Sequence, residues 1–184
     1  MQRTRFNRRQ LITFLFSFLI VALLVLFDQL SKKHFVNLNQ KENLAFNNKK
    51  VFGDFFYFTF LYNTGSAYGM LSNKAWAQTF FAVITPIAVL IFALGLIYAT
   101  KKDYKFLGVA IILIISGTIG NYVDRITMGK VVDFLCIQIF GERIFGIFNI
   151  ADVYLSVGMV MTIIHLLFMD KNAIFGKNNA KSKD

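Results

Sequence analysis

The sequence has few of the residues that build disulfide frameworks and metal centres. Its 184 residues include one proline, one cysteine, Cys136, and two histidines, His34 and His165. A single cysteine excludes an intramolecular disulfide framework, and one cysteine with two histidines does not make a credible zinc site. No histidine lies near Cys136 in the sequence, so we interpret it as an apolar packing residue rather than a nucleophile. The composition therefore predicts no metal and no cofactor.

Acidic residues are also scarce, with 10 Asp and Glu against 20 Lys and Arg. The formal charge of +10 could indicate a nucleic-acid-binding protein, but the basic residues lie in tails and short loops rather than along one helix face. Anionic lipid headgroups and the control of membrane topology explain this distribution better. We therefore expect membrane phospholipids as partners and no nucleic acid.

Hydrophobic residues are abundant, at 56% of the chain, and 16% of the residues are aromatic. An ordinary soluble domain of this length does not have such a balance. Four uncharged stretches are long enough to cross a bilayer as helices. We predict an all-α membrane protein with four transmembrane helices and a small β-rich extracytoplasmic element. The single integral membrane domain, residues 1–184, would have spans at about 11–30, 75–100, 106–124 and 150–169 and an extracytoplasmic region at about 33–74.

The basic residues predict the topology of these spans. Four arginines precede the first stretch, three lysines lie in or beside the short loop between the second and third, and four lysines follow the fourth. By the positive-inside rule these segments are cytoplasmic. The first stretch is not followed by a small-residue cleavage site, so we expect a retained span rather than a signal peptide. Both termini are therefore expected in the cytoplasm.

A short aromatic run lies in the hydrophilic region after the first span. Residues 55–63, FFYFTFLYN, are too few to cross a bilayer as a helix and favour a strand or an amphipathic element at the interface. The run leads into YNTGSAYGM, where Gly65 and Gly69 permit an irregular backbone. We expect residues 63–69 to form a lid that becomes ordered on substrate binding.

Acidic residues gather at the outer ends of the predicted spans. Asp28, Asp124, Asp133 and Asp152 lie at or just beyond these ends, although an ionised aspartate at the centre of a span costs about 2.5–3.5 kcal/mol. Because the topology places all four on the outer side, we expect one active site near the outer leaflet. Asp28 and Lys32, spaced i,i+4, can pair on one helix face, either to support this site or as an ordinary interfacial ion pair.

Local structure alone could explain two of these acids. Asn121 lies at i,i+3 to Asp124 and at i,i+4 to Arg125, so a helix-end salt bridge would account for that aspartate. Asn149 is a natural helix N-cap, and Asp152 three residues later could complete a capping box. Neither explanation requires a catalytic role for Asp124 or Asp152.

Asp133 has no helix terminus obviously assigned to it. Two carboxyl groups within a few ångströms share a proton, so one can act as general base on a water while the other acts as acid. This aspartyl-protease chemistry needs no metal, and we favour Asp133 with Asp152 as the pair, with Asp124 as the runner-up. A proton-coupled transporter and a non-catalytic scaffold remain alternatives at this point.

The motifs DQLSK, YNTGSAYG, GNYVDR, VVDF and FNIAD resemble, in order and spacing, those of the lipoprotein signal peptidases, also called signal peptidase II. They span residues 28–152, nearly the whole predicted fold. The resemblance implies a bacterial inner-membrane aspartyl endopeptidase. Its substrates would be prolipoproteins, cut just before the lipid-modified cysteine. We expect it to work as a monomer.

The resemblance also implies residue roles. The catalytic dyad maps onto Asp133 in VVDF and Asp152 in FNIAD. Asn63 and Arg125 resemble residues that hold the substrate backbone. The residues that match supporting positions are Asp28, Lys32, Gly65, Asn121, Asp124 and Asn149.

Two positions depart from the family's pattern. Ser116 precedes Gly117 where the family often has a Gly-Gly pair, and Val153 follows the motif aspartate where a small residue such as serine is common. We expect these departures to alter local packing and not the reaction.

Overall fold

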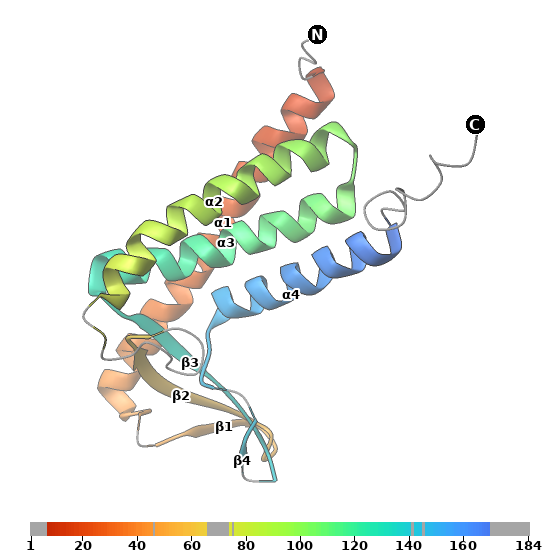
Figure 1. Cartoon of the computed structure of the whole chain (residues 1–184). Coiled ribbons are helices and arrows are strands. Elements are labelled where there is room, and N and C mark those ends of the chain that lie inside the picture. The colour runs from red at the N-terminus through yellow and green to blue at the C-terminus, as the bar shows by residue number, and fades with distance from the viewer. Residues whose placement is uncertain are drawn as a thin grey trace, which may run out of the picture.

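The computed structural model describes residues 7–45, 47–65, 74, 76–140, 142–144 and 146–169. Within these residues, four helices are long and apolar enough to span a membrane, and an antiparallel sheet lies at one end of the helix bundle (Figure 1). The helices are α1 (Arg8–Glu42), α2 (Ala77–Lys101), α3 (Lys105–Met128) and α4 (Ile150–Ile164), which continues as a π-helical segment, η2 (His165–Met169). The predicted fold class is confirmed.

Helix α1 begins at a capping box. The Asn7 side-chain oxygen accepts from the Gln10 backbone N–H at 2.8 Å, and the Gln10 side chain accepts from the Asn7 N–H at 3.1 Å. The 35 residues of α1 reach about 52 Å, whereas the hydrocarbon core of a bilayer is about 30 Å thick. The helix continues past the expected limit near residue 30 because Phe35 and Leu38 pack its extension against the sheet.

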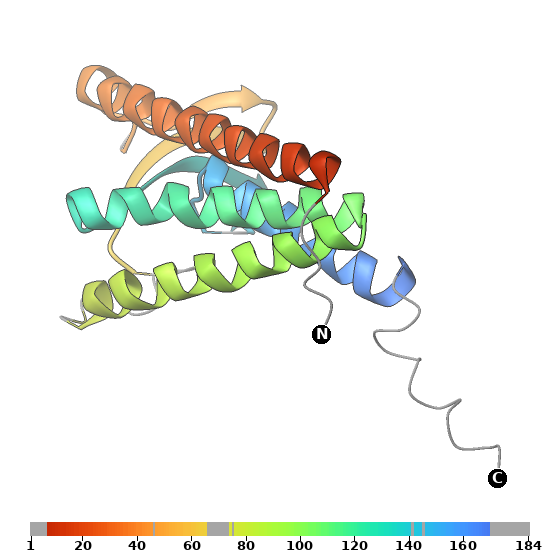
Figure 2. The same ribbon diagram turned by 90° about the horizontal axis from the view of Figure 1, so that it is seen from above.

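Helix α3 is the centre of the bundle. Figure 2 shows α3 between α1 and α2, and α4 packs on α3 as well. The most apolar segment of α3 is 56% buried, whereas the corresponding segments of α1, α2 and α4 are 6%, 6% and 17% buried. The outer helices therefore expose the apolar side chains that a surrounding bilayer would solvate.

Two glycines let α3 and α4 approach closely. A side-chain carbon at Gly117 of α3 would collide with the Ala151 carbonyl oxygen, and one at Gly158 of α4 would lie 2.7 Å from the Ala110 carbonyl oxygen. Small residues at such contacts bring helix backbones together in membranes. Ser116, at the departure noted above, is fully buried and its hydroxyl donates to the Ile112 carbonyl at 2.7 Å.

The sheet is a meander that joins two distant parts of the chain. Its strands are β1 (Lys49–Phe52), β2 (Phe56–Asn63), β3 (Val131–Ile139) and β4 (Glu142–Arg143), in that spatial order. Strand β2 corresponds to the aromatic run for which a strand or an amphipathic element was expected, whereas no strand was predicted for residues 131–139. Asn63 pairs with Val131 and Phe56 with Ile137 in the antiparallel β2–β3 register.

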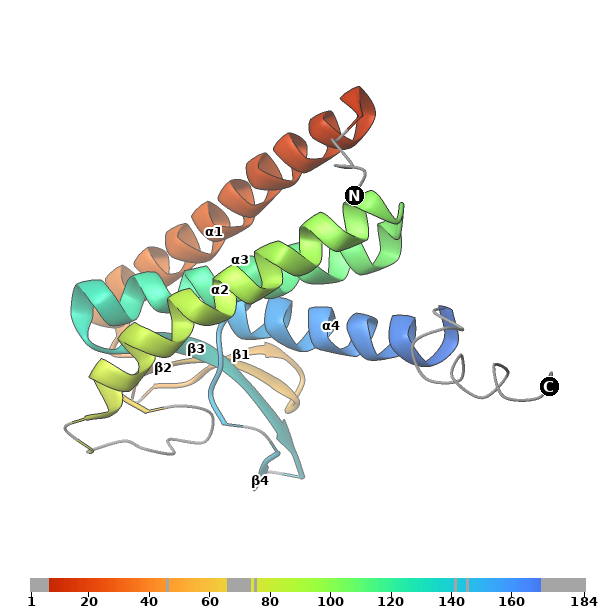
Figure 3. The same cartoon turned by 45° about the horizontal axis from the view of Figure 1, so that its top comes forward.

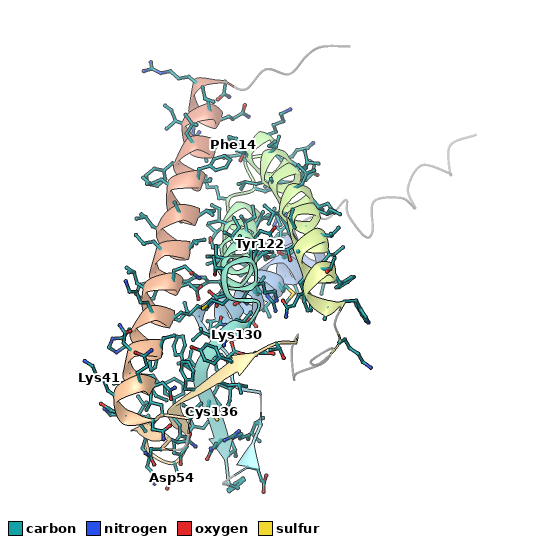
Figure 4. The ribbon with its side chains drawn as sticks, turned by 90° about the vertical axis from the view of Figure 1, so that its left-hand side faces the viewer. Phe14, Lys41, Asp54, Tyr122, Lys130 and Cys136 are labelled. Carbon is teal, nitrogen blue, oxygen red and sulfur yellow. The ribbon has the colours of Figure 1, made fainter. Side chains whose placement is uncertain are left out.

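One half of the sheet packs against the extension of α1. The ring of Phe35 stacks on that of Phe134 with centroids 4.0 Å apart, and Leu44 and Phe60 are buried in the same cluster. From there the strands run crosswise to the helices (Figures 1 and 3). In Figure 4, Lys41 and Asp54 lie at the sheet end of the molecule, while Phe14 lies at the other.

Close packing at Gly117 leads to the first prediction. Gly117→Ala should lower the free energy of unfolding by about 1–3 kcal/mol, because the added methyl group forces α3 and α4 apart. The control is Gly108→Ala on the same helix, where the methyl group meets no atom within 4 Å and helix propensity improves by up to about 1 kcal/mol. Unfolding in mixed micelles followed by circular dichroism measures both. Equal stability of the two variants would contradict the packing argument.

Candidate active site

Strand β3 carries Asp133 into the junction between the sheet and the bundle. The side chain is 1% exposed. One of its carboxyl oxygens accepts from the Asn149 side-chain amide at 2.7 Å, and the other accepts from the Asn63 side-chain amide at 3.0 Å. Strand β2 supplies Asn63 and the start of α4 supplies Asn149, so three separate elements fix this carboxyl group.

Helix α4 presents Asp152 from its first turn. Asn149 is the N-cap, and the predicted capping box is present: Asp152 accepts from the Asn149 backbone N–H at 3.1 Å. The second carboxyl oxygen of Asp152 accepts from the Asn121 side-chain amide of α3 at 2.7 Å. The capping role therefore occupies one oxygen only, and the other is held by a different helix.

Both carboxyl groups line one cavity of about 580 Å³. Its other polar lining residues are Asn63, Asn121, Arg125 and Ser156. Apolar side chains of α4 extend it along that helix, among them Val153, Leu155, Val157 and Met159. Across the described ranges, no group of three or more His, Cys, Asp or Glu side chains is placed to hold a metal ion.

The cavity gives Asp133 an unusual proton affinity. Burial, and next the negative charge of Asp152, raise the pKa of Asp133 from the ordinary aspartate value of 3.8 to about 7. Hydrogen bonds from Asn63 and Asn149 and the charge of Lys32 act in the opposite direction and are smaller. Asp133 therefore keeps a proton up to about neutral pH, which lets it act as an acid there.

A buried cation links the elements behind this cavity. The ammonium of Lys32 on α1 lies 2.9 Å from Asp28 and 3.0 Å from Asp124, with all three side chains at most 3% exposed. It also donates to the side-chain oxygen of Asn121 at 3.0 Å. The same Asn121 oxygen accepts from Asn149 at 3.0 Å. The Asn121 side chain therefore links Lys32 to Asp152, because its oxygen accepts from Lys32 and its amide N–H donates to Asp152.

The two acids paired with Lys32 also bind backbone groups. Asp28 accepts from the Ala151 N–H at 3.0 Å, at the start of α4, and Asp124 accepts from the Val132 N–H at 3.1 Å, at the start of β3. These backbone groups directly precede Asp152 and Asp133 in the chain. The network therefore fixes both segments that carry the cavity's carboxyl groups.

Arg125 contributes a guanidinium to the cavity, where it binds backbone carbonyl groups. It donates to the Gly65 carbonyl and to the Asn121 carbonyl, both at 3.3 Å, and lies 4.6 Å from the ring centre of Phe81. Gly65 also donates its backbone N–H to the Asn63 side chain at 2.9 Å. These bonds join the end of β2 to α3.

Comparison with known proteins identifies this arrangement. The family model described as signal peptidase (SPase) II, Peptidase_A8, matches residues 20–168. The chain belongs to the signal peptidase II family. The recognition made from the motifs is confirmed, and the chain is a peptidase with several membrane-spanning helices.

Individual relatives of this signal peptidase II family member agree with the assignment. Lipoprotein signal peptidases of Staphylococcus aureus strains JH9 and Newman are each 40% identical over 154 residues, covering 82% of this chain and 87% of the relative. A bacterial membrane enzyme solved by the in meso method at 2.3 Å has a TM-score of 0.66 and 36% identity, over 91% of this chain and 93% of that one. A second, solved at 1.9 Å, has a TM-score of 0.65 and 38% identity, over 83% and 92%.

The structure brings the residues predicted from the signal peptidase II motifs together. The predicted pair of Asp28 with Lys32 is present. The salt bridge considered for Asp124 on its own helix is replaced by contacts with α1 and β3. The predicted lid lies outside the described residues from 66 onward. The catalytic and substrate-binding roles stay predictions.

One polar residue of this network was not predicted from the sequence. Gln29 donates to Asp124 and to the Gly120 carbonyl, both at 3.0 Å, and to Asp28 at 3.2 Å. It belongs to the DQLSK motif, and its position next to Asp28 was the only available signal. Cys136 is fully buried, as expected of a packing residue.

The buried ion network leads to the second prediction. Lys32→Met should lower the free energy of unfolding by about 3–5 kcal/mol, because it leaves Asp28 and Asp124 buried without their cation. Combining it with Asp28→Asn and Asp124→Asn should restore most of that loss, since no buried charge remains unpaired. Unfolding in mixed micelles is the measurement.

The control for this prediction is Lys50→Met. Lys50 of β1 pairs with Asp54 in the exposed turn that follows, and the two side chains are 66% and 81% exposed. Removing this ion pair should therefore leave the free energy of unfolding unchanged. If Lys32→Met were as stable as Lys50→Met, the structural role of the network would be refuted.

Proposed function

We propose that this chain is an aspartyl endopeptidase that removes signal peptides from lipid-modified prolipoproteins, with Asp133 and Asp152 as its catalytic pair. The observation that carries the proposal is the opening of both carboxyl groups into one cavity, with the pKa of Asp133 raised to about 7. Such a pair, holding one proton, activates water without a metal. The name of the curated relatives, lipoprotein signal peptidase, supports the substrate class.

The proposed reaction assigns different tasks to the two carboxyl groups. Asp152, as carboxylate, takes a proton from a water that attacks the scissile carbonyl carbon, while Asp133 donates its proton to the carbonyl oxygen. The tetrahedral intermediate collapses when Asp152 gives its proton to the leaving nitrogen and Asp133 recovers its own. Arg125 and Asn63, which line the cavity, would hold substrate carbonyl groups during this sequence.

The shape of the cavity supports a lipid-modified substrate. Its apolar wall follows α4 away from the carboxyl groups, and Val153, Val157 and Met159 are also exposed on the membrane-facing part of that helix. Acyl chains attached near the scissile bond can therefore remain in lipid while the peptide reaches Asp133 and Asp152. Both acids come from one chain, so a monomer is sufficient.

We further propose that the sheet and the site lie at the outer leaflet, with both termini in the cytoplasm. The α2–α3 connection with Lys101, Lys102 and Lys105 lies at the end of the bundle opposite the sheet (Figure 1). The positive-inside rule assigns such a loop to the cytoplasm. Asp28, Asp124, Asp133 and Asp152 then share one membrane level, which argues against an ion path across the bilayer.

The decisive test is cleavage of a diacylglyceryl-modified prolipoprotein by purified variants. Asp133→Asn and Asp152→Asn should each lower kcat by at least about 10²- to 10⁴-fold, since each removes a proton-transfer group. Asp103→Asn, in the exposed loop at the other end of the bundle, is the matched control and should cleave normally. Folded Asp133→Asn and Asp152→Asn variants that still cleave normally would remove the assignment of these two acids as the catalytic pair.

The raised pKa of Asp133 predicts the pH dependence of turnover. Asp133 loses its proton as the pH rises through about 7, so kcat should fall about tenfold per pH unit above that value. In Asp152→Asn the pKa of Asp133 should be lower, because a neighbouring negative charge is gone. Infrared spectroscopy of the protonated carboxyl band follows this titration directly. A kcat that stays constant from about pH 6 to 9 would contradict the proton assignment.

A further inference from the structure

The end of the sheet remote from α1 exposes a cluster of large apolar side chains. We call this cluster the distal tip; it comprises Val51, Phe52, Phe55, Phe140 and Ile144, in and beside the β1–β2 and β3–β4 turns. Phe140 is 102% exposed and Phe52 is 75% exposed. Phe140 also has a φ of +53°, a conformation that is rare for bulky residues.

The two turns lie next to each other, so the cluster is continuous. The Gln138 N–H donates to the Phe55 carbonyl at 2.9 Å, and the Ile144 N–H donates to the Ile137 carbonyl at 3.3 Å. Phe56 pairs directly with Ile137 across β2 and β3. The apolar side chains of both turns therefore form one patch.

Packing within the described chain does not account for this patch. The other half of the sheet buries Phe60 and Phe134 against α1, whereas the distal tip leaves its aromatic side chains exposed. Strand edges with exposed apolar side chains promote aggregation in water, and contiguous apolar patches mark contact with another phase or molecule. The distal tip therefore requires a partner.

The bilayer around the bundle is the partner that the geometry favours. Phe148, two residues before α4, bridges to Leu135, so β3 passes the first turn of α4, where that helix enters its apolar stretch. Beyond this point the strands continue crosswise to the helices rather than away from them (Figures 1 and 3). The tip is thus carried over the lipid beside α4.

The chemistry of the tip fits the boundary between headgroups and acyl chains. Aromatic side chains are enriched at this depth of a membrane. The charged side chains beside the tip are of both signs, with Lys50 and Arg143 against Asp54 and Glu142, all exposed. Near-balanced charge favours a contact based on apolar insertion rather than on anionic headgroups.

We infer that the distal tip inserts into the lipid interface of the leaflet on the sheet side, as a second membrane contact separate from the four helices. The contact fixes the far end of β3, and therefore the strand that carries Asp133, relative to the membrane surface. This inference depends on the helices lying in a bilayer and not on the catalytic assignment.

The single tryptophan of the chain makes a direct test possible. Trp76→Phe first removes the native tryptophan. In this background, Phe52→Trp or Phe140→Trp then places a single fluorophore at the distal tip. In proteoliposomes, lipids brominated near the top of the acyl chain should quench either tryptophan at least about threefold more than the control. Emission should also move to shorter wavelength.

The control is Lys41→Trp in the same background. Lys41 is exposed on the last turn of α1, 13 residues beyond Asp28, or about 20 Å along the helix axis, and so beyond the lipid. Quenching at both tip positions no stronger than at this control would overturn the inference. Emission at shorter wavelength without lipid quenching, lost when the protein is diluted in lipid, would also overturn it by identifying a second copy as the partner.

Discussion

The ammonium of Lys32 is the contact on which the rest of this fold depends. It is a buried positive charge shared by two buried carboxylates, and each carboxylate in turn holds a backbone N–H at the start of a different segment. A desolvated charge tolerates little displacement, because its energy rises steeply when a partner moves away. Helices α1 and α3, strand β3 and the start of α4 are therefore held in one arrangement by electrostatics that apolar packing alone would not specify.

The four aspartates at the junction of the sheet and the bundle fall into two groups with different partners. Asp28 and Asp124 bind a cation, whereas Asp133 and Asp152 accept hydrogen bonds from the side-chain amides of Asn63, Asn121 and Asn149. A neutral amide orients a carboxyl group without neutralising it, so the mutual repulsion of the second pair persists. That repulsion, added to burial, is what retains a proton at Asp133 near neutral pH.

The sequence was sufficient for the helices and for most of the polar residues that line the cavity, whereas of the sheet it indicated only the region of strand β2. Long uncharged runs bounded by basic residues have no soluble alternative, which is why all four spans could be predicted. Strand β3 lacks the alternation that identifies a strand, because most of its residues are buried on both faces, and its partner strand lies about 70 residues away. The motifs predicted which acids gather, but the division of Asp124 and Asp133 between Lys32 and the amides depends on contacts between elements.

The pairing of β2 with β3 also sets an order on the assembly of the protein. The helices α2 and α3 lie between these two strands in the chain, so the strands meet only after that hairpin has crossed the membrane and returned. Contacts between such distant segments form late, because the intervening chain must first be ordered. Asn63 and Asp133 belong to opposite strands of this pair. A partly inserted chain therefore has no complete cavity, and the two carboxyl groups come together only when membrane insertion is finished.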